Sequence, residues 1–370
     1  MTERLCSFDA RLNPEDATSQ ASGEPDFVYS KSSILSNLPL PLPDQTFDSL
    51  VAMVGIQNGL RVGSESLRVI LGSASIKTDR LFHVGTFRAY EALQGSVYDS
   101  YEEFIAKHTF LPLFKPFIPE KTYRRIEKDL KSDTVGGLSN VLASDSAPRQ
   151  RHAYRYCVHC AENSIQARGF AYAQRTHQIP GVDFCYEHGT VLTSASPDIH
   201  PNKALAHGLI LPTDNCEWQS MLIPIIPLGD SPAWRSFVKW VEIALQGKFP
   251  VASEGMRTML LQHKIREITK ERGFTDPPAV LLQRHLIRSY GAEALEKLGL
   301  PIFTASTAHW PTFLILGTKY ADHPIANLLA FAALFDSPHD VTKRIARFEK
   351  FLVPRYESIS AFAGVRLNFA

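Results

Sequence analysis

Apolar residues recur at helical spacing just after a proline-punctuated stretch near the start of the chain. Residues 38–44 alternate leucine with proline, which excludes a regular helix there because proline lacks an amide hydrogen and restricts the residue before it. After this stretch, apolar side chains three and four residues apart predict a helix, with Asp44 as its N-cap. The apolar positions of this helix are Phe47, Leu50, Val51 and Val54.

A second short helix is predicted to follow, capped by Ser64. Its apolar positions are Leu67, Ile70 and Leu71. Gly59 and Gly63 lie in the turn between the two helices, so the pair resembles a helix-turn-helix unit. Two packed helices that bind no ligand would show the same pattern.

The C-terminal part is also helical in pattern. Helices are expected over 234–245, where the apolar face starts at Phe237, and over 256–268. Gly273 should end the second of these, and Pro277 and Pro278 should start another helix that runs to Tyr290. A helix, a glycine-containing turn and another helix indicate a DNA-binding unit.

Two segments in the middle of the N-terminal half have other patterns. Residues 108–119 combine aromatic side chains with prolines, so we expect an extended brace across a core, with His108 as a structural hydrogen-bonding residue. A helix is expected from Glu120 to Leu130, and its basic residues are interrupted by acids, which favours a solvated face.

Composition limits the class of protein. A chain of 370 residues with 44% hydrophobic residues can bury more than one core. The net charge is +1, so any contact with nucleic acid must come from local basic patches. The N-terminus does not resemble a signal peptide and no long apolar run occurs, so we expect a soluble, cytoplasmic protein with no membrane association.

Two knuckles with metal-ligand spacing lie in the middle of the chain. Cys157 and Cys160 form a Cys-x-x-Cys pair, and Cys185 and His188 form a Cys-x-x-His pair. Three thiolates and one imidazole suit Zn²⁺, and four protein ligands leave no open position, so we expect one structural zinc ion. Gly189 should allow the sharp turn after the second knuckle.

Other interpretations of these cysteines stay open. Either His159 or His177 could replace His188 as the fourth ligand. The two cysteines of the first knuckle could also be buried small apolar residues or a redox pair. Five cysteines, three of them in this arrangement, fit a reducing compartment better than a disulfide framework.

The region around the second knuckle resembles the zinc-finger region of the TniQ/TnsD family of transposon target selectors. The similarity rests on the string Arg-Thr-His-Gln-Ile-Pro-Gly-Val at 175–182, followed by Cys185 and by His188 with Gly189. Val158 departs from the family, which usually has proline there. Further similar strings occur at 43–50, at 108–119 and around the His323-Pro324 pair, so the resemblance spans 38–335.

The resemblance implies a mainly α fold with several parts. It places a polar N-terminal arm at 1–37, a TniQ-type helix-turn-helix domain at 38–148 and a zinc-finger module at 149–195. A connecting segment at 196–250 and a C-terminal helical domain with helix-turn-helix character at 251–370 complete the expected layout.

Basic residues are the candidates for contact with nucleic acid. Some surround the zinc-finger module, interleaved with aromatic side chains, and others lie on the C-terminal helices. Ordinary solvated charge is the competing interpretation. The candidates are Arg155, Arg168, Arg175, Lys264, Arg266, Lys270, Arg272, Arg284 and Arg288.

The sequence shows no pattern typical of an enzyme. A phosphate-binding loop ending in Lys-Ser or Lys-Thr, a Gly-x-Ser-x-Gly elbow and a His-Glu-x-x-His pair are all missing from the chain, so we expect no catalytic residues. A transposase or nuclease would need acidic residues that converge on Mg²⁺, and spacing alone nominates no such set.

Two functions follow from the resemblance. In the first, the protein binds double-stranded target DNA at the bacterial nucleoid and recruits the TnsC-type AAA+ ATPase, so that the transposase inserts there. In the second, it is an adaptor that links a CRISPR effector of the Cascade type to that ATPase, as a homodimer, without reading sequence itself. The near-zero net charge favours the adaptor, and the basic residues at 257–288 favour direct DNA contact.

Overall fold

The computed structural model describes most of the chain between residue 35 and residue 363. The described residues are 35–72, 85–93, 98–132, 153–195, 205–212, 218–270, 276–302, 310–318 and 323–363, without side chains after residue 350. Three expectations lie mostly or wholly outside this set: the N-terminal arm, the linker at 132–148 and the break at Gly273. The described part is mainly helical, as expected.

The N-terminal helices form the unit that the periodicity predicts. They are α1 (Phe47–Gln57), α2 (Ser64–Leu71), α3 (Thr86–Ala92), α4 (Tyr101–His108), α5 (Leu111–Phe114) and α6 (Glu120–Lys131). Helix α1 packs on α2, and α3 packs on α2, α4 and α6. The helix expected at 120–130 is confirmed by α6.

Three local expectations for this unit were wrong. The N-cap of α1 is Thr46, whose side chain accepts from the Ser49 amide, because Asp44 takes a left-handed backbone conformation with φ 52°. Gly63 occupies the cap position of α2, and Ser64 is its first residue. The brace at 108–119 is not extended throughout, because the four residues of α5 form a helical turn.

His108 has the structural role expected for it. It is 1% exposed, its Nδ1 lies 3.0 Å from the carbonyl oxygen of Gln45, and its Nε2 lies 2.7 Å from the Tyr98 hydroxyl. A carbonyl oxygen can only accept, so Nδ1 carries the proton and Nε2 accepts from the hydroxyl. This histidine therefore ties α4 to the segment that enters α1.

The central part combines short strands with helices. These elements are β1 (Tyr154–Tyr156), α8 (Val158–Arg168), β2 (Ala171–Tyr172), α9 (Arg175–Gln178), β3 (Thr193–Ala195), β4 (Leu209–Ile210) and β5 (Ile223–Pro224), with 3₁₀ turns at Leu205–His207 and Trp218–Met221. One antiparallel sheet has the order β1-β3-β5 and pairs Tyr156 with Thr193, and a second sheet pairs β2 with β4. The strands bring 154–156 beside 193–195. They therefore hold together the two ends of the segment that contains both knuckles.

The C-terminal helices surround one buried helix. They are α10 (Pro232–Leu245), α11 (Glu254–Lys270), α12 (Pro278–Tyr290), α13 (Ala292–Lys297), α14 (Trp310–Leu316), α15 (Pro324–Leu334) and α16 (Pro338–Ala363). Helix α15 is buried almost throughout and packs against α10, α11, α12 and α14. The ring of His323 begins it by accepting from the Ala326 amide at 3.1 Å, which gives the His-Pro pair a capping role.

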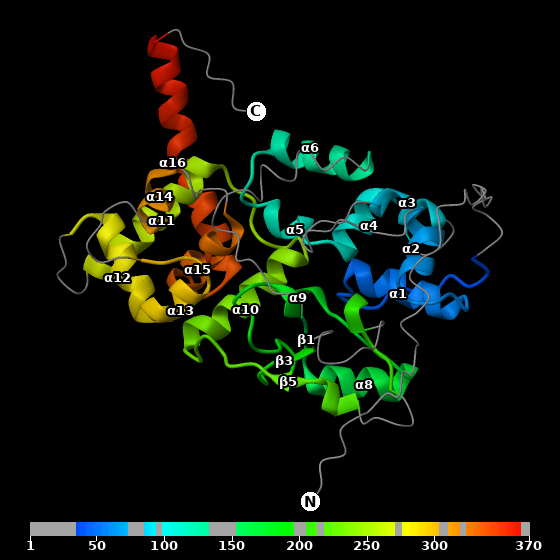
Figure 1. Ribbon diagram of the computed structural model, residues 1–370. Helices are drawn as coiled ribbons and strands as arrows, with labels where there is room; N and C mark the ends of the chain where they lie inside the picture. Colours follow the sequence, from blue (N-terminus) through cyan, green and yellow to red (C-terminus); the bar gives the residue numbers. More distant parts are fainter. Residues whose placement is uncertain are drawn as a thin grey trace, which may run out of the picture.

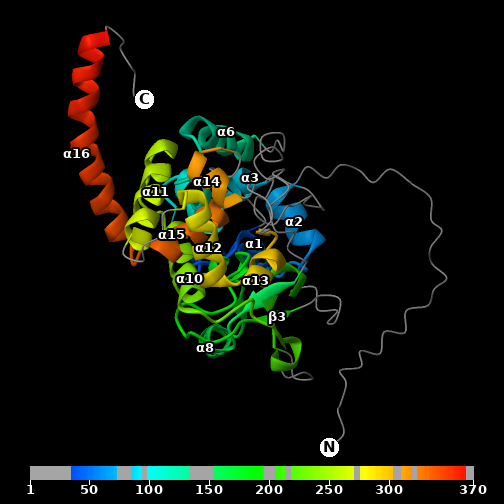
Figure 2. The ribbon, with the colours of Figure 1, turned by 90° about the vertical axis from the view of Figure 1, so that its left-hand side faces the viewer.

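Helix α10 links the parts of the molecule. Figure 1 shows α1–α4 on one side and α11–α15 on the other, with α5, α9 and α10 between them, and α10 packs against α5, α9 and α15. The end of α16 projects away from the other helices in both views (Figure 2). A single cluster of buried apolar side chains extends from Phe47 of α1 to Val341 of α16. The domain boundaries expected from the sequence stay a prediction.

Candidate metal centre

The first knuckle lies where a strand becomes a helix. Cys157 follows β1 directly and occupies the N-cap position of α8, and Cys160 lies in the first turn of that helix. One helical turn brings residues three apart to the same side. Both sulfurs can therefore face one point.

The second knuckle is a tight turn closed by backbone hydrogen bonds. The Cys185 amide donates to the Thr190 carbonyl and the Gly189 amide donates to the Cys185 carbonyl, both at 2.8 Å. Gly189 has φ 64°, a conformation that glycine adopts without strain, which confirms the expected turn. The turn holds Cys185 and His188 on the side that faces α8.

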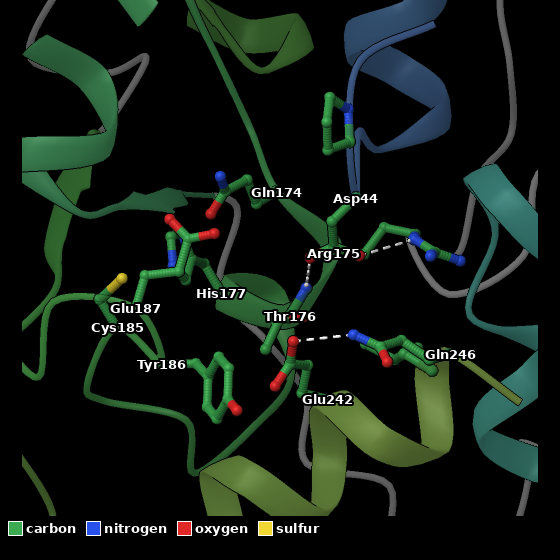
Figure 3. A pocket seen from close by; sticks show the side chains of 12 residues that line it. Asp44, Gln174, Arg175, Thr176, His177, Cys185, Tyr186, Glu187, Glu242 and Gln246 are labelled. Carbon is green, nitrogen blue, oxygen red and sulfur yellow. Dashed lines mark hydrogen bonds and ion pairs between the residues drawn. The ribbon is translucent and has the colours of Figure 1, made fainter. Parts of the chain in front are cut away.

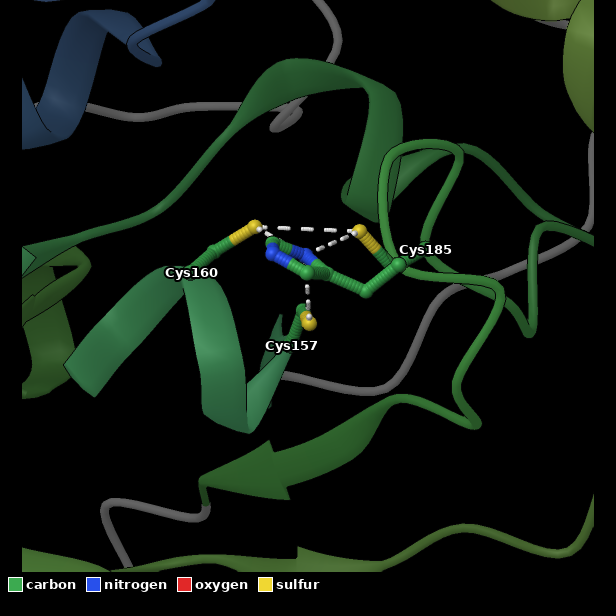
Figure 4. Close-up of side chains that lie close together, drawn as sticks. Cys157, Cys160 and Cys185 are labelled. Atoms are coloured by element: carbon green, nitrogen blue, oxygen red, sulfur yellow. Dashed lines mark hydrogen bonds between the residues drawn. The ribbon is translucent and has the colours of Figure 1, made fainter. Parts of the chain in front are cut away.

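The four expected ligands converge on one point. Their ligand atoms all lie within 4.8 Å of one another. The His188 Nδ1 atom is 3.5 Å from the Cys157 sulfur, 3.3 Å from the Cys160 sulfur and 3.5 Å from the Cys185 sulfur. The sulfurs of Cys160 and Cys185 are 3.7 Å apart, and Figure 4 shows the three cysteines turned toward a common centre.

These separations match a tetrahedral zinc site. With sulfur at about 2.3 Å and nitrogen at about 2.0 Å from the ion, tetrahedral angles require sulfurs roughly 3.8 Å apart and sulfur and nitrogen roughly 3.5 Å apart. The set could therefore hold a metal ion such as zinc, through Nδ1 of the histidine. Because all four positions would be filled by protein, the ion would stabilise the fold and bind no substrate.

Ionisation of the crowded thiols also favours a cation at this point. Contact with the Cys160 thiol lowers the pKa of Cys157 far below its ordinary value, and the same contact raises the pKa of Cys160 far above its own. Several thiolates this close repel one another, so they cannot all ionise without a compensating charge. A bound divalent cation would supply that charge and hold every ligand deprotonated.

The competing interpretations of this region find less support. The three cysteines of the group are free thiols in the described residues. His159 is exposed, with its ring centroid 5.3 Å from that of His188, and His177 is buried nearby, but neither belongs to the group whose ligand atoms converge.

Arg155 fixes the segment between the knuckles from inside the protein. Its guanidinium donates to the carbonyl oxygens of Ile179 at 2.6 Å and Val182 at 2.9 Å, and lies 3.3 Å from a carboxylate oxygen of Asp183. Asp183 also accepts from the Leu228 amide at 2.8 Å. Burial lowers the pKa of Arg155 to about 10, which leaves it charged and paired.

Arg175 connects the same segment to the N-terminal helices. It is 6% exposed, its Nε lies 3.0 Å from an Asp44 carboxylate oxygen, and it donates to the carbonyl oxygens of Ala106 at 2.6 Å and Thr109 at 2.8 Å. The other Asp44 oxygen accepts from the Thr176 amide at 2.8 Å. The sequence predicted Arg155 and Arg175 on a DNA-facing surface, whereas Arg175 is buried and Arg155 is only partly exposed.

Comparison with known proteins shows which family this part of the chain resembles. Residues 38–192 match the family model TniQ. The similarity to the TniQ family thus lies in this TniQ segment, which is less than half of the chain. Over 289 residues the chain is also 22% identical to the transposon Tn7 transposition protein TnsD of Escherichia coli, an alignment that covers 75% of this chain and 53% of that protein. The chain thus spans about half the length of this curated relative, and the resemblance seen in the sequence is confirmed.

The TniQ segment includes the N-terminal helices and the whole candidate metal centre. Of the candidate basic residues within it, Arg168 at the end of α8 is exposed. The sequence did not predict that Arg155 and Arg175 hold backbone segments together within the protein. Their partners are mostly backbone carbonyls, and no spacing in a sequence marks those.

The other candidate basic residues lie beyond the TniQ segment, on α11 and α12. Lys264 pairs with Glu267 at 3.0 Å, and Arg284 pairs with Asp276 at 2.6 Å. Arg266, Lys270 and Arg288 are exposed, and Arg272 lies outside the described residues. Helices α11 and α12 pack against each other. Arg266, Lys270 and Arg288 are therefore exposed on two neighbouring helices and form no ion pair among the described residues.

None of the described helices is both long enough and apolar enough to cross a lipid bilayer.

Proposed function

We propose that this chain selects the target site of a TnsD/TniQ-type DNA transposon. It would bind double-stranded target DNA and recruit a TnsC-type AAA+ ATPase, and that ATPase would direct the transposase. The observation that carries the proposal is the TniQ match over 38–192, which contains a Cys₃His group with zinc geometry. The protein would act as an accessory factor and leave the chemistry of strand transfer to the transposase.

The metal centre would serve this function by holding a surface rigid. A structural zinc ion would lock Cys157 and Cys160 to the turn at 185–188, while Arg175 holds the same region against α4 and the start of α1. A rigid module gives a partner a preformed surface and reduces the entropy cost of binding.

DNA contact would come from the exposed cations outside the core. Arg168, Arg266, Lys270 and Arg288 remain candidates, because their side chains are exposed. Contacts of this kind bind phosphate and release counterions, so affinity falls steeply with salt. Lys264 and Arg284 would contribute less, since each already has an acidic partner.

The test is DNA binding by the purified, zinc-loaded protein at two salt concentrations, on random duplex and on fragments that flank natural insertion sites. Replacing Arg266, Lys270 and Arg288 by alanine should weaken binding to all sequences and reduce the salt slope by about three if each contacts a phosphate. Lys121→Ala with Arg125→Ala, on the exposed face of α6, is the matched control. An unchanged slope in the triple variant would remove these residues from the interface.

A second function is favoured by the charge distribution. The net charge is +1, and acids neutralise two of the candidate cations on α11 and α12. As a homodimeric adaptor between a Cascade-type effector and the ATPase, the protein would need no DNA affinity of its own. Weak binding to every duplex, together with capture of the ATPase on beads that carry the folded protein, would support this alternative.

A further inference from the structure

A pocket of about 240 Å³ lies between the metal-binding turn, α9 and α10. Figure 3 shows Glu187 and His177 together on the side of the turn, and Tyr186 and Glu242 on the side nearer α10. The pocket shares Cys185 with the candidate metal centre and contains none of the proposed DNA contacts. Its lining residues are Pro43, Asp44, Gln174, Arg175, Thr176, His177, Cys185, Tyr186, Glu187, Glu242, Leu245 and Gln246.

The pocket is lined by acidic side chains, and Glu242 already accepts a hydrogen bond from Gln246 at 2.8 Å. The Asp44 carboxylate is paired with Arg175, the one cationic side chain in the lining. Glu187 and Glu242 form no ion pair with any cation in the described part of the chain. Burial raises the pKa of Glu242, so this carboxylate would gain from the arrival of a cation.

His177 adds a polar group that lacks a partner. It is 3% exposed, it lines the pocket, and no hydrogen bond to its ring occurs among the described residues. Burial lowers its pKa to about 4, so the ring is neutral near pH 7 and keeps one nitrogen able to accept a hydrogen bond. A neutral ring in the pocket wall can accept a hydrogen bond from a ligand that donates.

Size and shape identify the kind of donor. The acids and His177 do not form a group close enough to share a metal ion, since the Cys₃His group is the one such cluster within the described ranges. The volume is below that of typical sites for small molecules. A guanidinium group carries five N–H donors in a plane and can also lie on an aromatic face, which the half-exposed ring of Tyr186 offers.

We propose that this pocket receives the guanidinium group of an arginine side chain from a partner protein. Glu242 and Glu187 accept its N–H groups, His177 accepts one more, and Tyr186 packs against its plane. The site joins a surface beside the metal centre to whichever protein presents the arginine. The inference goes beyond target selection and needs no DNA to test.

The experiment uses the full chain loaded with zinc and ligand-observed saturation-transfer NMR, which detects millimolar affinities. The probes are N-acetyl-arginine methylamide, its citrulline counterpart, in which a neutral urea replaces the guanidinium, and its lysine counterpart. We expect signal from the arginine probe, none from citrulline and weaker signal from lysine. Glu242→Gln should weaken the arginine probe about tenfold, because it removes a charged acceptor.

Control variants separate this effect from damage to the fold. Glu293→Gln removes an exposed acid on α13 that pairs with Lys297, and it should leave probe binding unchanged. Zinc content and thermal unfolding are measured for each variant, and Tyr186→Leu supplies a second pocket variant if Glu242→Gln fails to fold. Loss of arginine binding in Tyr186→Leu would support the proposal in the same way.

Four results would overturn it. Equal signals from the arginine and citrulline probes would show that charge is not recognised, and equal arginine and lysine affinities would remove the preference for guanidinium. Unchanged affinity in a folded Glu242→Gln variant would place the probe elsewhere. Tighter binding of agmatine, a free small guanidine, than of the methylamide would assign the pocket to a metabolite in place of a protein arginine.

Discussion

At the scale of single residues, two arginines and four ligands hold the centre of this protein together. Arg175 donates to carbonyl groups at the end of α4 and pairs with Asp44, while Arg155 binds the carbonyl groups that precede the second knuckle. Each guanidinium donates to two carbonyl oxygens and pairs with a carboxylate, which the several planar N–H groups of arginine allow and the compact ammonium of lysine does not.

The metal ligands make the first prediction. Cys185→Ser should release the ion and lower the free energy of unfolding by several kcal/mol, roughly 3 or more, because structural zinc binding contributes directly to folding. Metal content and denaturant unfolding measure both effects. His159→Ala is the matched control, because that exposed histidine adjoins the ligands without belonging to them. A metal-free Cys185→Ser variant as stable as the parent would contradict the zinc assignment.

His108 predicts how stability depends on pH. Burial lowers its pKa from 6.5 to about 3 in the folded protein. The unfolded chain therefore binds a proton that the folded chain does not, and the contribution of His108 is lost as the pH falls below 6.5. The loss should approach about 1.4 kcal/mol per pH unit for this one group.

The comparison for His108 is with His108→Gln. This variant will be less stable at pH 7, and its stability should fall less steeply between pH 6.5 and 5 than that of the parent. Denaturant titrations at several pH values above 5 measure the two slopes, before protonation of the metal ligands contributes. Parallel slopes would mean that the pKa of His108 is not lowered in the folded protein, because every other titrating group contributes equally to both proteins.

Much of the candidate site was readable from residue spacing, and the rest was not. Two residues between ligands place both on one turn, so the spacing around Cys157 and Cys185 predicts convergence from local geometry. The role of Arg175 depends on Asp44, which lies 131 positions away, and on carbonyl groups that have no signature in a sequence. These groups come together only in the folded chain. The sequence alone therefore could not distinguish Arg155 and Arg175 from arginines on the surface.

At the scale of elements, helices α1 and α2 approach each other more closely than any side chain would allow. A β-carbon at Gly55 in α1 would lie 2.0 Å from the Ser66 hydroxyl oxygen of α2. The Ser66 hydroxyl donates to the Arg61 carbonyl at 2.9 Å, which fixes it in that position. The absence of a side chain at Gly55 therefore sets the packing of α1 on α2.

Gly55→Ala should lower the free energy of unfolding by about 1–3 kcal/mol, since overpacking outweighs the better helix propensity of alanine. Gly255→Ala in α11 is a matched control, because no atom lies within 4 Å of a β-carbon there. That substitution should be neutral or stabilise the protein by up to about 1 kcal/mol. Equal effects of the two substitutions on denaturant midpoints would argue against close packing of α1 on α2.

The spacing of apolar residues predicted which segments are helices more reliably than it predicted the capping residues at their ends. Helices α10, α11 and α12 begin and end within a few residues of the expected positions, because their apolar faces pack against the buried α15. The N-cap of α1 moved to Thr46, since Asp44 is held by Arg175 and by the Thr176 amide. Local propensity predicted Asp44 as the N-cap, but its tertiary contacts engage its carboxylate elsewhere.

At the scale of the whole molecule, the metal-binding segment lies between two groups of helices. Arg175 joins it to α4 and the start of α1. Gly181, with φ 82°, lies so close to Phe237 of α10 that a β-carbon would be 3.2 Å from its ring. One cluster of buried apolar residues includes Cys157 and Cys185 together with side chains of both groups of helices. Loss of the metal ion should therefore destabilise helices in both groups.

Hydrogen exchange after removal of zinc by a chelator tests this coupling. We expect amides at 154–192 to lose protection first, followed by those of α1 and α10, which contact that segment. Helices α12 and α14 should keep their protection, because they pack on α11 and α15 and not on the metal-binding segment. Local opening of this kind spreads through contacting elements and leaves independent ones closed. Unchanged protection in α1 would mean that Arg175 holds the two parts together without the ion. Loss of protection in α12 as well would make the chain from α1 to α15 a single cooperative unit, against the separate C-terminal domain predicted at 251–370.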